Sequence, residues 1–262
     1  MTADAKIAPS SKSEGANEWV EIVKTIIYAL LIALVLRVLL FQPFTIPSAS
    51  MEPNLFEGDY IIVSKFNYGY SRHSTPISLP SSLFSGRLLA REPTRGDIVV
   101  FKLPRDTSGR TDYVKRLIGL PGDRIQVRQG VVYINDQPIV RKPMPSGTED
   151  MGDGMMRPVQ RYQETLPNGV TYLTNSWGDN GDVDNTAVFI VPQGHYFMMG
   201  DNRDNSLDSR FPEEVGVGFV PFENLEGPAQ IVLLSWTPGA SLFKPWTWVM
   251  NARPSRFFHM LR

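Results

Sequence analysis

The chain has 262 residues and a formal net charge of −1, with 42% hydrophobic and 20% charged residues. This composition is typical of an ordered globular protein, and the near-neutral charge gives no general attraction to nucleic acid. The sequence contains no cysteine, which excludes cysteine nucleophiles, thiolate metal sites and disulfide bonds. The length allows one large domain, or one domain with an insertion.

The N-terminal part combines a polar segment with an apolar one. Residues 1–18 are polar with little periodicity and are predicted to form a disordered tail. Residues 19–41 are apolar and lack the 3.6-residue period of a soluble amphipathic helix. With Lys24 and Arg37 extended toward the two membrane surfaces, Ile22 to Phe41 gives 20 residues, enough to cross a bilayer. We therefore expect one transmembrane helix at 19–41.

The alternative for the apolar stretch is a cleaved signal peptide. Ser48-Ala49-Ser50 has the small-x-small pattern that precedes a cleavage site. The segment before the apolar stretch is long, however, and residues 42–47 form a bulky, rigid spacer, which favours a retained helix. Lys and Arg in the short N-terminal flank favour a cytoplasmic N-terminus, with the larger C-terminal part outside.

Beyond residue 41 the sequence indicates β-structure. Short runs rich in Val, Ile and aromatic residues, bounded by Gly and Pro, predict strands at 59–65, 97–103, 124–140, 187–191, 195–199 and 230–236. A hairpin is expected around Gln129-Gly130 and a turn at Asn135-Asp136. Residues 142–186 are rich in Gly, Asn, Asp and Pro and carry one strand-like run, Gly169 to Thr174, so we interpret them as an inserted subdomain. The predicted fold is mainly β.

Two prolines bracket a pair of serines just after the apolar stretch. Pro47 and Pro53 each fix their own φ and push the preceding residue toward extended geometry. Ser48 and Ser50 are therefore expected on a stiff, extended segment. A hydroxyl that must approach a carbonyl from one direction needs such a mount. We interpret Ser50 as a nucleophile held just outside a membrane; the alternative is a polar loop without a catalytic role.

A lysine lies on a predicted strand at 113–118. Tyr113, Lys115 and Leu117 share one face of this strand, because successive side chains alternate between the two faces. Burial beside these neighbours disfavours the ammonium form and lowers the pKa of the lysine. A neutral lysine can act as a general base. The alternative is a surface lysine that protects an edge strand from aggregation.

The segment 200–210 is dense in Asp, Asn, Ser and Arg, residues that fix loops through side-chain hydrogen bonds. Its Asp spacing does not match an EF-hand calcium loop, and its opposite charges favour internal ion pairs, so no metal site is predicted. His195, which opens a strand before this loop, is the candidate base of an alternative Ser-His-Asp arrangement.

Five boxes together resemble the bacterial type I signal peptidases, which are membrane-anchored serine-lysine proteases. The family pattern is a Ser-x-Ser-Met-x-Pro-x-Leu box, a Gly-Asp-Tyr strand, an Arg-Gly-Asp-Ile/Val-Val-Val-Phe strand, a Tyr-x-Lys-Arg strand and a Gly-Asp-Asn-x-x-Asn-Ser-x-Asp-Ser-Arg loop. These boxes occur here in the same order as Ser48 to Leu55, Gly58-Asp59-Tyr60, Arg95 to Phe101, Tyr113 to Arg116 and Gly200 to Arg210. Three features depart from the pattern: Ala49 replaces the usual glycine, one anchor replaces the two of some members, and the tail from Trp236 follows no fixed family pattern.

The resemblance implies a role for each matched residue. Ser50 would attack the scissile carbonyl, Lys115 would take its proton and later activate the deacylating water, and Ser206 would orient Lys115. The Ser50 amide and the Ser48 hydroxyl would form the oxyanion hole. The small residues of a signal peptide would enter shallow pockets lined by Ile46, Met51, Leu55, Tyr113 and Val114. Structural ion pairs would form among Arg116, Asp201, Asp208 and Arg210.

The resemblance also implies the architecture and its setting. An antiparallel β catalytic domain over 42–262, with the insertion at 142–186, would stand outside the bacterial plasma membrane on a single-pass anchor. The expected partners are signal peptides of exported preproteins and membrane lipid, with no nucleic acid and no cofactor. One alternative is a self-cleaving repressor-type Ser-Lys protease, which shares the fold but would need a DNA-binding helix pair that the sequence does not show. The other is a membrane-tethered β-domain that binds signal-like segments without cutting them.

Overall fold

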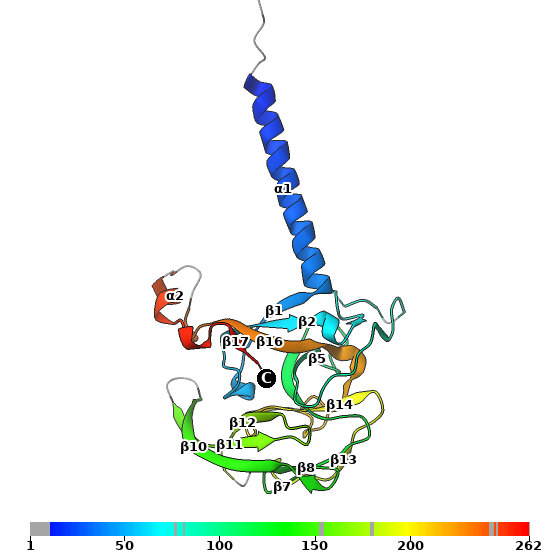
Figure 1. Ribbon diagram of the computed structural model, residues 1–262, viewed down its shortest axis with the longest axis vertical. Coiled ribbons are helices and arrows are strands. Elements are labelled where there is room, and N and C mark those ends of the chain that lie inside the picture. The colour runs from blue at the N-terminus through cyan, green and yellow to red at the C-terminus, as the bar shows by residue number, and fades with distance from the viewer. Residues whose placement is uncertain are drawn as a thin grey trace, which may run out of the picture.

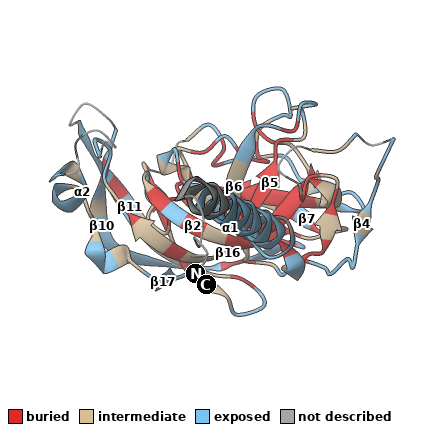
Figure 2. Ribbon diagram, turned by 90° about the horizontal axis from the view of Figure 1, so that it is seen from above, coloured by how far each residue is buried: buried red, intermediate tan, exposed pale blue. Residues whose placement is uncertain are grey.

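The computed structural model describes residues 11–75, 78–80, 82–151, 155–178, 181–240, 244 and 246–261. One long helix, α1 (Ser11–Leu39), projects from a body made of strands (Figure 1). Its 22-residue stretch Glu18–Leu39 is apolar enough to span a membrane, and the apolar window within it is not buried against the rest of the protein (Figure 2). At 1.5 Å per residue this stretch is about 33 Å long, which matches a hydrocarbon core of about 30 Å.

The limits of α1 differ from the predicted ones at both ends. Residues 11–18, predicted to belong to a disordered tail, are helical, while residues 1–10 lie outside the described part of the chain. The sequence of this segment includes Glu, Lys and Ala, which favour helix, so a helix that starts in the apolar stretch propagates backward. At the other end Pro43 lacks an amide hydrogen, and the chain leaves the helix after Leu39 to enter β1 (Phe41–Thr45).

The body consists of antiparallel sheets, and the predicted mainly β, antiparallel fold is confirmed. The largest sheet has the strand order β1-β2-β16-β5-β6-β14-β15, with β17 paired to β16. Its further strands are β2 (Asp59–Ser64), β5 (Ile98–Lys102), β6 (Asp112–Gly119), β14 (His195–Met199), β15 (Val220–Pro221), β16 (Leu225–Ser235) and β17 (His259–Met260). In Figure 2 the buried residues gather in the strands around β5 and β7.

Three smaller sheets have the orders β13-β7-β8-β9, β10-β11-β12 and β3-β4. Their strands are β3 (Tyr70–Ser71), β4 (Arg87–Leu88), β7 (Arg124–Arg128), β8 (Val131–Ile134), β9 (Gln137–Pro138), β10 (Val140–Asp150), β11 (Met156–Thr165), β12 (Thr171–Ser176) and β13 (Phe189–Ile190), and a short helix α2 spans Trp246–Met250. The predicted hairpin turns at Gln129-Gly130 and Asn135-Asp136 are confirmed, since all four residues have positive φ between paired strands.

The segment expected to carry one strand contains three. β10, β11 and β12 form an antiparallel sheet in which β10 is an edge strand, with a register shift between Met144 and Gly147. Pro143 and Pro145 lie in this edge strand, where a missing amide donor is tolerated. The prolines and the mostly exposed side chains of β10 hide the strand pattern, which is why the sequence indicated only the run Gly169 to Thr174. The division of the chain into a catalytic domain and an inserted subdomain remains a prediction.

Candidate active site

The candidate nucleophile lies on a short turn between β1 and β2. Ala49–Met51 forms one turn of 3-10 helix, in which the Glu52 amide donates to the Ala49 carbonyl at 3.0 Å. The extended mount predicted for Ser50 is therefore wrong, although Ser48 before it is extended, with φ −149° and ψ 158°. Each flanking proline restricts only itself and the residue before it, which leaves the residues between free to close a turn.

The turn is anchored from below by buried apolar side chains. Met51 and Leu55 are 1% and 0% exposed, and both belong to the hydrophobic cluster that contains Ile46. The Leu55 amide donates to the Met51 carbonyl at 2.9 Å. Burial of each of these two side chains contributes about 1.5–3 kcal/mol to stability and holds the turn in place on the core. Leu55 is thus a core residue, and its role in binding substrate stays a prediction.

Lys115 of β6 contacts the candidate nucleophile directly. Its Nζ donates to Ser50 Oγ at 2.6 Å and to the Val114 carbonyl at 3.1 Å, and the residue is 3% exposed. Burial lowers the pKa of Lys115 to about 8, with Arg210 acting in the same direction and the carboxylates of Asp208 and Asp201 opposing it. The sequence analysis predicted a lowered pKa for this lysine from the same physical cause, burial of the ammonium group.

The polar loop at 200–210 is held by two buried ion pairs. Arg116 binds Asp201 through two hydrogen bonds of 2.7 Å each, and Arg210 binds Asp208 through two of 2.8 Å each. All four side chains are at most 1% exposed in these pairs. A buried bidentate pair loses much of its Coulomb energy to desolvation, so its main effect here is to fix geometry. The four residues predicted to form structural ion pairs therefore hold the polar loop in a fixed position near Lys115.

Asn202 links this loop to the nucleophile turn, a role that the sequence analysis did not assign. Its backbone amide donates to the Ser50 carbonyl at 3.1 Å, and its side-chain amide donates to the Ala49 carbonyl at 3.1 Å. Two hydrogen bonds from one residue hold the turn from the loop side. Asn202 belongs to the quoted 200–210 box, but its spacing alone does not indicate which backbone it binds.

Glu149 of β10 in turn holds the loop. Its carboxylate, 1% exposed, accepts hydrogen bonds from Asn202 at 2.6 Å, from Asn205 at 2.7 Å and from the Trp177 indole at 2.8 Å. A chain of contacts therefore runs from the three-stranded sheet through the polar loop to the nucleophile turn. No sequence signal marks Glu149, because it lies in a part of the predicted insertion that shows no strand pattern.

The two other serines take different positions. Ser48 Oγ lies 3.3 Å from Ser50 Oγ on the exposed side of the turn. Ser206 Oγ is buried and has no hydrogen-bond partner within the described residues, so the expected contact with Lys115 is not made. A Cβ placed on Gly200 would lie 2.2 Å from Ser206 Oγ and 2.6 Å from the Ser50 carbonyl oxygen. Ser206 therefore packs against the backbone beside the nucleophile.

These groups open into one cavity of about 690 Å³. Of the five residues predicted to bind substrate, Ile46, Met51, Tyr113 and Val114 line this cavity together with the catalytic candidates. The full lining is residues 44–51, 111–115, 204–207 and Phe211. Its walls are apolar near 44–46 and 113–114 and polar near Ser50 and Asn205, which suits an extended peptide with small side chains at the reacting end.

The histidines lie away from this cavity. His195 Nδ1 is 3.0 Å from the Gln193 carbonyl, His73 is buried beside Ser78, and His259 is exposed on β17. None of the three lines the cavity, so the Ser-His-Asp alternative lacks its base. Over the described ranges no group of three or more His, Asp or Glu side chains has a metal-binding arrangement.

The family model and the curated relatives agree on one family. The family model for signal peptidase, peptidase S26, matches residues 19–236. The chain is 45% identical over 251 residues to signal peptidase I of Rickettsia typhi and 44% identical to that of Rickettsia prowazekii, covering 89% of this chain and 90% of each relative. A crystal structure of a signal peptidase I from Enterococcus faecalis is 26% identical, covering 53% of this chain and 97% of that one with a TM-score of 0.30.

Proposed function

The chain belongs to the signal peptidase I family, peptidase S26, and from this premise we propose that Ser50 and Lys115 perform its peptide cleavage. Proteins of this family are serine endopeptidases that cut signal peptides from exported proteins. The observation that carries the assignment is the 2.6 Å contact between Lys115 Nζ and Ser50 Oγ at a lysine that is 3% exposed. The family match also removes support from the repressor-type alternative.

The first half of the reaction forms an acyl-enzyme. Above its lowered pKa Lys115 is neutral, so the contact reverses and the Ser50 hydroxyl donates to Nζ. Ser50 Oγ attacks the scissile carbonyl while its proton moves to Lys115. The tetrahedral oxyanion is stabilised by the Ser50 amide and the Ser48 hydroxyl. As the peptide C–N bond breaks, Lys115 returns the proton to the leaving amine, which becomes the N-terminus of the mature chain.

The second half releases the signal peptide. Neutral Lys115 takes a proton from water, the hydroxide attacks the acyl carbon, and Ser50 leaves with the proton returned through Lys115. Ser206 Oγ, buried beside this site with a free hydrogen-bonding capacity, is proposed to orient Lys115 or the water once the substrate has excluded bulk solvent. The side-chain pockets of Ile46, Met51, Tyr113 and Val114 hold the small residues that precede the cut.

We also propose a setting for the enzyme. α1 crosses the bacterial plasma membrane once, in contact with lipid, with a cytoplasmic N-terminus and the catalytic domain outside. α1 ends at Leu39, eleven positions before Ser50, so at most about 40 Å of chain separates the nucleophile from the membrane end of α1. A site at this height reaches the end of a membrane-embedded signal peptide. Protease access to the C-terminal domain in sealed vesicles tests the orientation.

Pre-steady-state kinetics distinguish the proposed protease from a domain that binds signal peptides without cutting them. Mixing the full chain with an excess of signal-peptide substrate should give a burst of released mature peptide equal to the concentration of enzyme. Ser50→Ala, which keeps the cavity but lacks the nucleophile, should bind the substrate and give no burst. Binding by the unaltered chain with no release of mature peptide, either as a burst or in the steady state, would support the non-cutting alternative instead.

A further inference from the structure

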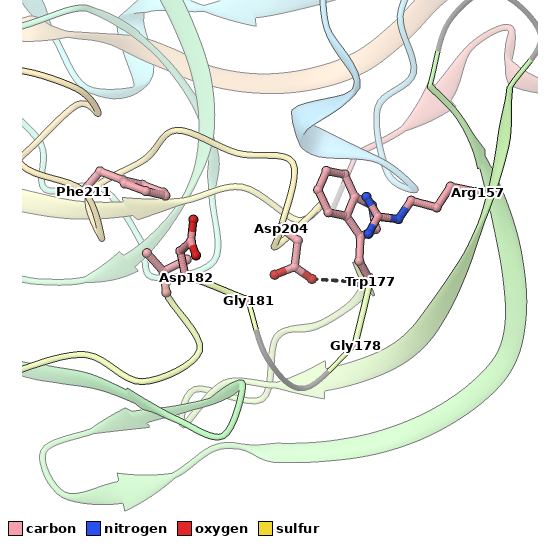
Figure 3. A pocket seen from close by; sticks show the side chains of 8 residues that line it. Arg157, Trp177, Gly178, Gly181, Asp182, Asp204 and Phe211 are labelled. Atoms are coloured by element: carbon pink, nitrogen blue, oxygen red, sulfur yellow. Dashed lines mark hydrogen bonds between the residues drawn. The ribbon is translucent and has the colours of Figure 1, made fainter.

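A second cavity adjoins the catalytic one. It has a volume of about 430 Å³ and is lined by Arg157, Trp177, Gly178, Gly181, Asp182, Val183, Asp204 and Phe211 (Figure 3). Asp204 and Phe211 also line the catalytic cavity, so the two share a wall at one end of the polar loop. The catalytic steps derived above use none of the other lining residues of the second cavity.

The lining offers unused groups for a polypeptide. Asp204 Oδ2 accepts from the Trp177 amide at 2.6 Å and from Ser176 Oγ at 3.1 Å, whereas its buried Oδ1 has no hydrogen-bond partner among the described residues. The Arg157 guanidinium lies 3.9 Å from the centroid of the Trp177 ring. Figure 3 shows Phe211 on one side of the Asp204 carboxylate and Trp177 with Arg157 on the other. Because Oδ1 is buried against Gly181, the groups that the cavity offers to a ligand are the two aromatic side chains, which suit an apolar side chain of an extended peptide.

The position of the cavity indicates which part of a substrate reaches it. The lining of the catalytic cavity includes 44–47, at the end of β1, and also 204–207 and Phe211, of which Asp204 and Phe211 are shared with the second cavity. β12, which immediately precedes Trp177, lies farther from α1 than β1 does (Figure 1). A signal peptide held in the membrane therefore enters at 44–47. The chain beyond the scissile bond must continue away from the membrane, toward Asp204.

We propose that the second cavity binds an extended segment of the mature chain, within about six residues of the scissile bond. The proposal rests on the proposed signal-peptide cleavage and adds a specificity site to it. Trp177, Val183 and Phe211 enclose one side chain of the mature segment. Contacts on this side place the leaving amine as well as the scissile carbonyl, so cleavage efficiency depends on residues that the released signal peptide does not contain.

The test compares two peptides with the same signal-peptide part, one ending two residues and the other six residues after the scissile bond. In the full chain the longer peptide should have the higher kcat/KM by about tenfold, equivalent to about 1.4 kcal/mol. Val183→Phe fills the cavity and should bring the ratio of the two kcat/KM values close to one. Val215→Phe makes the same change at a position that is 51% exposed and lines neither cavity, and it should keep the wild-type ratio.

Phe211→Ala serves as a second variant if Val183→Phe does not fold, and it should also lower the ratio. Equal kcat/KM for the two peptides in the unaltered chain would overturn the proposal while leaving the cleavage reaction intact. An equal loss for both peptides in Val183→Phe, with the ratio kept, would overturn it too, because the cavity would then support only the fold. Cleavage of neither peptide by the unaltered chain would instead contradict the proposed function itself.

Discussion

Raising the pH from about 6 to about 9 should increase kcat/KM along a limb centred near pH 8. Lys115 must be neutral to accept the Ser50 proton, and burial lowers its pKa to about 8 from the ordinary value of 10.5. At pH 8 about half of the enzyme would carry a neutral lysine, against about 0.3% without the shift, a gain of about 150-fold. The neutral fraction is about 1% at pH 6 and about 90% at pH 9, so the full rise is about 90-fold.

The assay is kcat/KM of the detergent-solubilised full chain on a fluorogenic signal-peptide substrate at constant ionic strength. Glu52 is a second titrating group near the nucleophile: burial, with the charge of Glu149, raises its pKa to about 7. Glu52→Gln is the matched control, and its limb should stay near pH 8. A limb near about 6.5, typical of an ordinary histidine, or one that disappears in Glu52→Gln, would refute Lys115 as the base.

Three further changes test the surroundings of the nucleophile. Ser48→Ala should lower kcat by about 10²- to 10³-fold with little change in KM, because the lost donor acts in the transition state; unchanged activity would place the oxyanion elsewhere. Glu149→Gln leaves one of the three donors to this carboxylate facing an NH₂ group, so it should lower the free energy of unfolding by about 1–3 kcal/mol and also lower kcat/KM. Denaturant titration and steady-state kinetics measure the two effects, and Glu213→Gln at an exposed position should change neither. Gly200→Ala brings a methyl group 2.6 Å from the Ser50 carbonyl oxygen and should abolish cleavage; normal kinetics would show that the nucleophile turn tolerates displacement.

The sequence predicted the features that depend on local periodicity and on motif identity. The apolar stretch forms a helix, the runs at 59–65 and 195–199 form β2 and β14, and alternation along β6 buries Lys115. The helix follows from the length of the apolar stretch, and the strands follow from short runs of β-branched and aromatic residues bounded by turn residues. The quoted boxes also contain Ser50, Lys115 and Ser206, which all line the catalytic cavity.

The features that the sequence did not predict depend on tertiary contacts. The turn at Ser50 is closed by a local hydrogen bond and anchored by Leu55, whose burial follows from packing against strands distant in the chain. β10 shows no strand pattern because an edge strand tolerates proline and exposed side chains. Glu149 binds Asn202 across 53 positions of sequence, a separation at which no local pattern indicates contact.

The central claim is that Ser50 and Lys115 act as one catalytic unit, and a mutant cycle on kcat tests it most directly. Ser50→Ala, Lys115→Ala and the double variant are compared on one signal-peptide substrate above pH 8, with folding checked by thermal unfolding. Each single change should lower kcat by about 10⁴- to 10⁶-fold, and the double variant should be no worse than either, because removing one member leaves the other without a function. Substantial cleavage by Lys115→Ala, or losses that multiply in the double variant, would contradict the claim.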